Sequence, residues 1–201
     1  MLTIGLTGPS GAGKGVVASL FAEYGVPSID TDAVYHDLLI PPSVCLDELA
    51  ERFGPTILTP DGRLDRRILA SLVFGAGHEA ELTDLNRITH RHVLDKVRLL
   101  LTEYKAAGIS AVLVDAPQLY ESGFDTECDY VVAVLAPRDT RLARIMARDG
   151  LDEARAAARI DAQKSDEFFR SHAHAVLMNQ GAIEALEAEI RNLLVRWEVL
   201  P

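Results

Sequence analysis

The chain has 201 residues, of which 48% are apolar and 25% charged. This length allows one well-buried core with an appended substructure and excludes two large independent domains. The formal net charge of -10 argues against a broad nucleic-acid-binding or membrane-binding surface, because such surfaces carry clustered Lys and Arg. No apolar run is long enough to cross a bilayer and no secretory signal is recognisable, so we expect a cytoplasmic protein. Cys45 and Cys128 form no CxxC motif, which predicts reduced thiols and no zinc site.

Five short apolar runs are predicted to be strands: residues 2–7, 27–30, 109–115, 129–136 and 175–179. Their continuous apolar character is typical of strands that are buried on both faces of a parallel sheet. Helical patterns follow the first strand and the last strand. The alternation of strands and helices predicts a three-layer α/β/α fold with a five-stranded parallel sheet.

Two longer excursions leave this predicted sheet. Residues 33–107 read as several helices, with breaks at Pro41-Pro42, at Gly54-Pro55 and at the turn 60–63. We expect a helical substrate-binding insertion here, because a simple crossover needs far fewer residues. Residues 151–174 are helical and charged, and they are predicted to form either a mobile lid or plain surface helices. The nucleotide-binding core would then comprise residues 1–32, 108–150 and 175–201.

The stretch "GPSGAGKG", residues 8–15, has the Gly-x4-Gly-Lys spacing of a phosphate-binding loop between a strand and a helix. Its glycines let backbone N–H groups approach an anion at a helix N-terminus, and Lys14 would neutralise phosphate charge. The hydroxyl that commonly follows this lysine and binds Mg2+ is absent, because the next residue is Gly15. The predicted ATP contacts of this segment are Gly8, Ser10, Gly11, Ala12, Gly13, Lys14, Gly15 and Val16.

Without that hydroxyl, Mg2+ would depend on the nucleotide phosphates, on water and on an acidic group near the loop. Asp115 is the candidate for this group, since it ends the apolar run "AVLVD" in the manner of a strand-borne acid beside a phosphate loop. An equally weighted alternative is that Asp115 caps the turn into Pro117.

The stretch "SIDTD" places Asp30 and Asp32 at the carboxyl end of the second predicted strand, where open α/β sheets bind ligands. A carboxylate at this position could orient a sugar hydroxyl and accept its proton during phosphoryl transfer. The alternative is that Asp32 caps a helix that begins at Ala33. The spacing alone leaves both interpretations open.

With these stretches in view, the chain resembles the dephospho-CoA kinase family over nearly its whole length. The family pattern I-D-A-D is matched by "IDTD", which makes Asp32 the implied catalytic base. The pattern D-G-x-L-x-R is matched by "DGRLDR" and implies that Arg66 contacts the substrate. "LNRITHRHV" matches L-N-x-x-x-H-P and implies a role for His90 in substrate binding, although Arg91 replaces the usual proline.

Further segments extend the resemblance. "DAPQLYE" matches D-x-P-L-L-x-E and implies substrate contacts by Pro117, Leu119 and Glu121, with Gln118 in place of a leucine. "RLARIMARD" and "RIDAQ" correspond to the lid region of the family. "NQG" corresponds to an Asn-x-Gly near the adenine, which makes Asn179 an implied ATP contact.

Three arginines follow the fourth predicted strand at helical spacing. Arg141, Arg144 and Arg148 would present three guanidinium groups on one helix face, where they could stabilise charge during phosphoryl transfer. We assign Arg144 a catalytic role together with Lys14 and Asp32, and we assign Arg141 and Arg148 to ATP binding. The alternative is a solvated stripe that pairs with neighbouring acidic residues.

The resemblance implies ATP-dependent and Mg2+-dependent phosphorylation of the ribose 3'-hydroxyl of dephospho-CoA to give coenzyme A. Its substrates would be ATP and dephospho-CoA, and no feature predicts an obligate protein partner. Two alternatives stay open at this stage. One is a nucleoside monophosphate kinase that acts on CMP, because the loop alone resembles that family. The other is a nucleotide-binding protein that has lost its catalytic activity.

Overall fold

A five-stranded parallel sheet is the centre of the structure, with the strand order β2-β3-β1-β4-β5. The computed structural model describes residues 1–75 and 77–201. Its strands are β1 (Leu2–Thr7), β2 (Ser28–Asp30), β3 (Ala111–Asp115), β4 (Tyr130–Leu135) and β5 (Ala175–Met178). The predicted parallel sheet is confirmed, with strands that are equal to or slightly shorter than the apolar runs.

The chain divides into two compact units. One comprises Met1–Ile29 with Tyr104–Pro201, and we call it the sheet unit; the other, Asp30–Glu103, we call the helical unit. Helices of the sheet unit are α1 (Lys14–Glu23), α6 (Arg138–Asp149), α7 (Glu153–Asp161), α8 (Asp166–His172) and α9 (Ile183–Arg196). A 3-10 turn, η2 (Phe124–Glu127), precedes β4.

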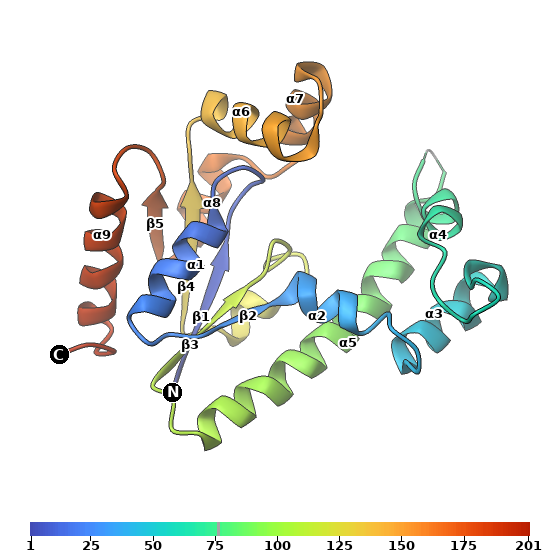
Figure 1. Ribbon diagram of the computed structural model, residues 1–201, viewed down its shortest axis with the longest axis horizontal. Helices are drawn as coiled ribbons and strands as arrows, with labels where there is room; N and C mark the ends of the chain where they lie inside the picture. Colours follow the sequence, from blue (N-terminus) through green and yellow to red (C-terminus); the bar gives the residue numbers. More distant parts are fainter. Residues whose placement is uncertain (76) are drawn as a thin grey trace. The chain divides into compact units, whose positions relative to one another are not determined.

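Helices α1 and α9 lie side by side on one face of the sheet (Figure 1). Phe21 of α1 and Ile190 of α9 are fully buried against strand residues such as Ile4 and Leu6. Burying one such side chain contributes about 1.5–3 kcal/mol, so this layer holds α1 firmly against the sheet. The start of α1 is therefore fixed directly after β1.

The opposite face is covered in part by α8. Phe169 packs there against Ala133 and Leu135 of β4. Helices α6 and α7 pack against each other through Ile145, Ala156 and Ile160. Figure 1 shows α6 and α7 beyond the end of the sheet from which the loop between β1 and α1 emerges. Residues 138–161 are thus placed close to that loop.

The helical unit contains α2 (Thr31–Asp37), α3 (Val44–Phe53), the 3-10 turn η1 (Pro55–Ile57), α4 (Arg66–Val73) and most of α5 (Glu79–Ala106). Each predicted break falls between two of these helices. A separate apolar core holds the unit together, and it comprises Leu39, Cys45, Leu46, Leu49, Ile57, Leu69, Val73, Leu85 and Ile88.

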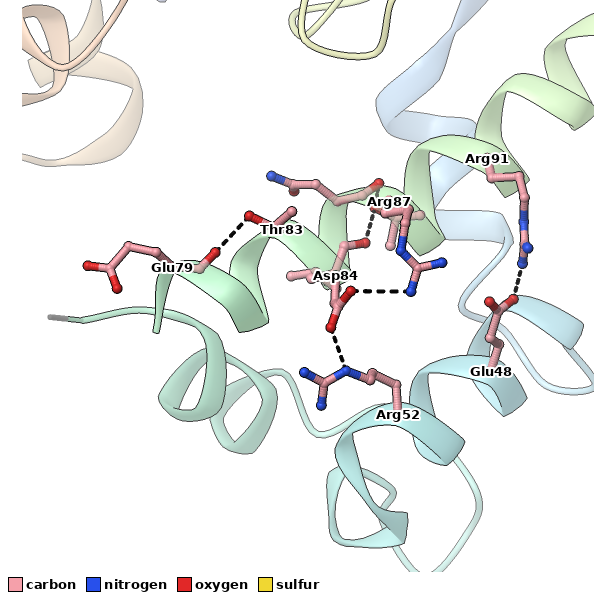
Figure 2. Close-up of polar contacts among 10 residues, drawn as sticks. Glu48, Arg52, Glu79, Thr83, Asp84, Arg87 and Arg91 are labelled. Carbon is pink, nitrogen blue, oxygen red and sulfur yellow. Dashed lines mark hydrogen bonds and ion pairs between the residues drawn. The ribbon is translucent and has the colours of Figure 1, made fainter. Parts of the chain in front are cut away.

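Polar contacts join α3 to α5 at the surface of this core (Figure 2). Asp84 accepts hydrogen bonds from Arg52 at 2.7 Å and from Arg87 at 3.2 Å. Glu48 is bonded by both Arg91 and His92. The hydrogen bond from His92 and the nearby charge of Arg91 lower the pKa of Glu48. Exposed ion pairs contribute little to the free energy of unfolding, but those between α3 and α5 favour one alignment of the two helices.

The family pattern has a proline at position 91, where this chain has Arg91. A proline there would make the local backbone irregular. Helix α5 instead runs without interruption through Arg91, whose guanidinium group bonds to Glu48. A proline at this position could not make that contact and would lack the backbone N–H of a helix interior. The substitution therefore adds a tie between α3 and α5 in this chain.

Candidate functional site

The loop between β1 and α1 adopts a conformation that only glycine accommodates at two key points. Gly8 has a φ of 144°, and a Cβ atom there would lie 2.2 Å from the carbonyl oxygen of Val134. Gly13 has a φ of 94°, and its Cβ atom would lie 2.1 Å from Nδ2 of Asn179. Both φ values lie in a region that disfavours side chains. The glycines at these positions are therefore required by close packing as well as by backbone geometry.

Backbone N–H groups of this loop are left open at the N-terminus of α1. Two amides are occupied, because Ser10 donates to Oε1 of Gln163 at 3.0 Å and Ala12 donates to the carbonyl of Pro9 at 3.1 Å. The amides that have no hydrogen bond within residues 1–75 and 77–201 are those of Gly11, Gly13, Lys14 and Gly15. Open amides at a helix N-terminus form an anion-binding cradle.

Lys14 is the first residue of α1 and is partly exposed. Its ammonium group forms no salt bridge with any residue that the structure describes. Gly15, the next residue, has nothing within 4 Å of the position that a Cβ atom would occupy. The lysine is thus available to a ligand, and a side chain at residue 15 would fit without rearrangement.

The three arginines of α6 do not form one exposed stripe. Arg141 is 6% exposed, and its Nη2 lies 3.6 Å from Asp166. Its Nε has no hydrogen bond to the described residues. The backbone of Arg141 lies against Gly11 of the phosphate loop. The ATP contact by the Arg141 guanidinium stays a prediction, and it would have to involve a side chain that is largely buried.

Arg144 and Arg148 both reach the phosphate loop. Arg144 Nη1 donates to the carbonyl oxygens of Gly11 and Ala12, at 3.2 Å in each case. Arg148 donates to Oγ of Ser10 at 3.2 Å and to both carboxylate oxygens of Asp149. The hydrogen bond from Arg148 lowers the pKa of Asp149. Asp149 therefore stays ionised and holds Arg148 beside the loop.

Asn179 lies directly after β5 and also touches the loop. Its Nδ2 donates to the carbonyl oxygen of Ala12 at 2.8 Å. Asp115 ends β3, where it is paired with Leu6 on β1, and the N–H of Ala116 donates to the carbonyl of Leu6 at 3.0 Å. The carboxylate of Asp115 is half-buried, and it lies on the strand next to β1, after which the phosphate loop begins.

The segment after β3 gives a mixed result for the predicted substrate contacts. Pro117 is exposed, whereas Leu119 is fully buried and would be only 2.9 Å from a Cβ atom at Gly5. The structure therefore does not support a direct substrate contact for Leu119, whose side chain fills the core beneath β1. Glu121 forms a salt bridge of 3.3 Å with Lys164, which precedes α8.

In the helical unit, the alternative role of Asp32 as a helix cap is ruled out. Helix α2 begins at Thr31, and the cap is Asp30, whose Oδ1 accepts from the N–H groups of Asp32 at 2.8 Å and Ala33 at 3.1 Å. Because capping involves Asp30, the carboxylate of Asp32 is not needed for it. Asp32 is exposed in the first turn of α2.

Arg66 and His90 lie in the same unit. Arg66 begins α4, with Asp65 as the cap, and its Nη2 donates to Nδ1 of His36 at 2.8 Å. Since His36 belongs to α2, this contact links Arg66 to the helix that carries Asp32. His90 is half-buried in the middle of α5.

Gln163 and Asp149 were not predicted as site residues. The contact of Gln163 with Ser10 spans 153 positions of sequence, and no local pattern reveals such a pairing. Asp149 is the last residue of α6 and Gln163 follows the C-cap of α7, and neither position gives more than a weak signal in the sequence. The described ranges contain no group of three or more His, Cys, Asp and Glu side chains placed to hold a metal ion. Within those ranges no helix is both long and apolar enough to cross a membrane.

A phosphate-binding loop between the first strand and first helix of a parallel sheet defines the class of P-loop kinases. Comparison with solved structures agrees. A protein named TT1252 from Thermus thermophilus superimposes with a TM-score of 0.79 at 34% identity, covering 97% of both chains. A dephospho-CoA kinase from Campylobacter jejuni shares the fold, with a TM-score of 0.68 at 23% identity over 96% of this chain and 94% of that chain.

Sequence comparison identifies the family. Residues 2–185 match the dephospho-CoA kinase family. A dephospho-CoA kinase of Corynebacterium efficiens is 39% identical over 96% of each chain. One from Moorella thermoacetica is 38% identical over 100% of this chain and 92% of its own. The chain belongs to the dephospho-CoA kinase family.

Proposed function

We propose that this protein transfers the γ-phosphoryl group of ATP to the ribose 3'-hydroxyl of dephospho-CoA and so produces coenzyme A. Membership of the family supports the reaction. The open amides at the start of α1 are the structural observation that carries the proposal, because they offer donors to a polyphosphate with no change in the loop. A free lysine at the same helix start adds the positive charge that terminal phosphates require.

The acceptor hydroxyl needs a group that orients it and takes its proton. We assign this role to Asp32, because its carboxylate is exposed and Asp30 provides the helix cap in its place. The insertion at 33–107 would bind dephospho-CoA, with Arg66 and His90 as contacts. Residues 151–174 would form the lid. Pro117 and Glu121 stay proposed contacts of the acceptor.

Negative charge develops on the phosphoryl group during transfer, and its stabilisation needs cations in addition to Lys14. We assign Arg144 and Arg148 to this task, because both already reach loop residues. The present partners of Arg144 are neutral carbonyl groups, and phosphate oxygens would be stronger acceptors for its guanidinium group, whereas Asp149 holds Arg148 beside the loop. Arg144 would then act on the transferred group, with Arg148 on the bound ATP.

Mg2+ would enter with ATP and neutralise charge on its phosphates. The residues present fit an ion held mainly by phosphate oxygens and water, because the described part offers no cluster of ligands and Gly15 offers no hydroxyl. Asp115 is the carboxylate that we propose orients the ion's water ligands. Its position at the end of β3, in register with Leu6, supports this role.

The proposed reaction is tested by incubating purified protein with ATP, Mg2+ and dephospho-CoA and measuring coenzyme A by chromatography. Coenzyme A should form in proportion to the enzyme added, and a Lys14→Ala preparation controls for kinases carried over from the host. CMP is offered as a competing acceptor. Phosphorylation of CMP alone would indicate a nucleoside monophosphate kinase, and tight ATP binding without transfer to any acceptor would indicate a binding protein.

A second test concerns the missing hydroxyl. Gly15→Ser should lower the Mg2+ concentration for half-maximal activity by about tenfold, equivalent to roughly 1.4 kcal/mol, because the hydroxyl replaces a water ligand. The open space around residue 15 accommodates the side chain. Initial rates over a Mg2+ titration at saturating ATP provide the measurement. Gly15→Ala is the matched control, and equal Mg2+ dependence in the Ser and Ala variants would contradict the expectation.

A further inference from the structure

The side chain of Asn179 is packed against one peptide group of the phosphate loop. Its own backbone N–H donates to the carbonyl of Leu135 at 2.7 Å, which anchors the residue at the end of β4. Its Nδ2 donates to the carbonyl oxygen of Ala12 at 2.8 Å. A Cβ atom on Gly13 would lie 2.1 Å from the same nitrogen, so the carboxamide lies directly over the Ala12–Gly13 peptide.

The same carbonyl has a second donor. Arg144 Nη1 reaches the oxygen of Ala12 at 3.2 Å from α6. Two side chains from distant parts of the sequence, 132 and 167 residues away, therefore hold one peptide oxygen of the loop. Both donors therefore lie on the carbonyl side of the Ala12–Gly13 peptide, opposite the N–H group of Gly13.

Planarity makes this orientation important for anion binding. The C=O and N–H of one trans peptide point in opposite directions, so fixing the carbonyl of Ala12 also fixes the direction of the Gly13 N–H. That N–H is one of the open donors of the cradle within the described ranges. If the peptide turned over, a carbonyl oxygen would replace the donor and would repel a phosphate oxygen.

From these contacts we propose that Asn179 is a positioning residue for the phosphate loop, which keeps the Gly13 amide directed at the phosphates of the bound nucleotide. This inference rests on the proposed ATP site and gives Asn179 a role other than contact with the adenine. Because Asn179 would act through the phosphate loop, its effect on binding would not depend on the adenine of the nucleotide. Asn179 should therefore affect any polyphosphate that occupies the cradle.

The test compares ATP with inorganic tripolyphosphate, which has the phosphates but no base. Dissociation constants of both are measured by calorimetry for wild-type protein, Asn179→Ala and Asn179→Asp. Asn179→Ala should weaken both ligands by the same factor, about five- to tenfold, the equivalent of one net hydrogen bond. Asn179→Asp should weaken both further, because a carboxylate would face the oxygen of Ala12.

Gln180→Ala is the matched control, because Gln180 is the exposed neighbour and its hydrogen bond to Met178 uses the backbone N–H, which the substitution keeps. Its affinities should equal those of wild type. If Asn179→Ala folds poorly, as judged by thermal unfolding, the nearly isosteric and uncharged Asn179→Leu variant, which cannot donate to the oxygen of Ala12, is measured in its place.

Three outcomes would overturn the inference. Weakening of ATP alone, with unchanged tripolyphosphate affinity, would assign Asn179 to the base. Unchanged affinities for both ligands in a folded variant would remove the positioning role while the proposed kinase activity stands. Failure of the wild-type protein to bind either ligand would overturn the inference and the proposed ATP site together.

Discussion

Asp32→Asn is expected to reduce kcat for coenzyme A formation by about 10²–10⁴-fold, the usual contribution of a general base. The Asn side chain keeps the size of Asp but cannot accept the proton of the ribose hydroxyl. Affinity for ATP should change little, because the loop donors are independent of this carboxylate. Steady-state kinetics with both substrates, together with ATP titration by calorimetry, separates the two effects.

Asp37→Asn is the matched control, since Asp37 is an exposed acid at the last position of the same helix. It should retain wild-type turnover. The stability of Asp32→Asn should also equal that of wild type, because the cap of α2 is Asp30. Near-normal turnover in Asp32→Asn would remove this residue from the role of base.

Lys14→Ala is expected to lower kcat/KM for ATP by about 10²–10³-fold, which is the loss found when one donor to developing charge is removed from an active site. The ammonium group is the positive side chain at the first residue of α1, where the terminal phosphates would lie. The fold should persist, because this lysine forms no salt bridge within the described ranges. Kinetics and thermal unfolding together give the measurement.

Lys105→Ala provides the control for loss of one positive charge, because Lys105 is exposed in the last turn of α5. Its kinetics should match wild type. If Lys14→Ala and Lys105→Ala behaved alike, the loop would not be the ATP site.

Local signals in the sequence predicted the sheet well. The run from Leu2 to Thr7 is a strand over its full predicted length, because the phosphate loop ends it with a glycine that the strand cannot continue through. The run ending at Asp115 was predicted two residues too long at its start. Ile109 instead follows the turn at Gly108, and its N–H bonds back to Tyr104.

The candidate site was harder to predict, because Asp30 and Asp32 lie two positions apart and either could cap the helix that follows. Asp30 and Asp32 are both good helix caps, and only the start of α2 at Thr31 decides which one is used. The arginine spacing in α6 predicted a helix, which the structure confirms over Arg138–Asp149, but it could not indicate which of the three side chains would be buried. The side chain of Arg141 is buried, and its Nη2 lies 3.6 Å from Asp166.

The stretch that matches the family after β3 contains both exposed and buried residues. Pro117 is exposed, whereas Leu119 is fully buried and fills the space left by Gly5. Sequence spacing cannot separate these groups, because both are retained in the same short stretch.

The contacts of Gln163, Arg144 and Asn179 with the phosphate loop have a thermodynamic consequence. These side chains bond to Ser10 and Ala12 from distant parts of the chain, so they restrict the conformational freedom of the loop. Ordering one backbone residue costs about 1–2 kcal/mol of entropy at room temperature, and a loop that is already rigid avoids this cost on association. Polyphosphate binding should therefore carry only a small penalty in the conformational entropy of the loop backbone.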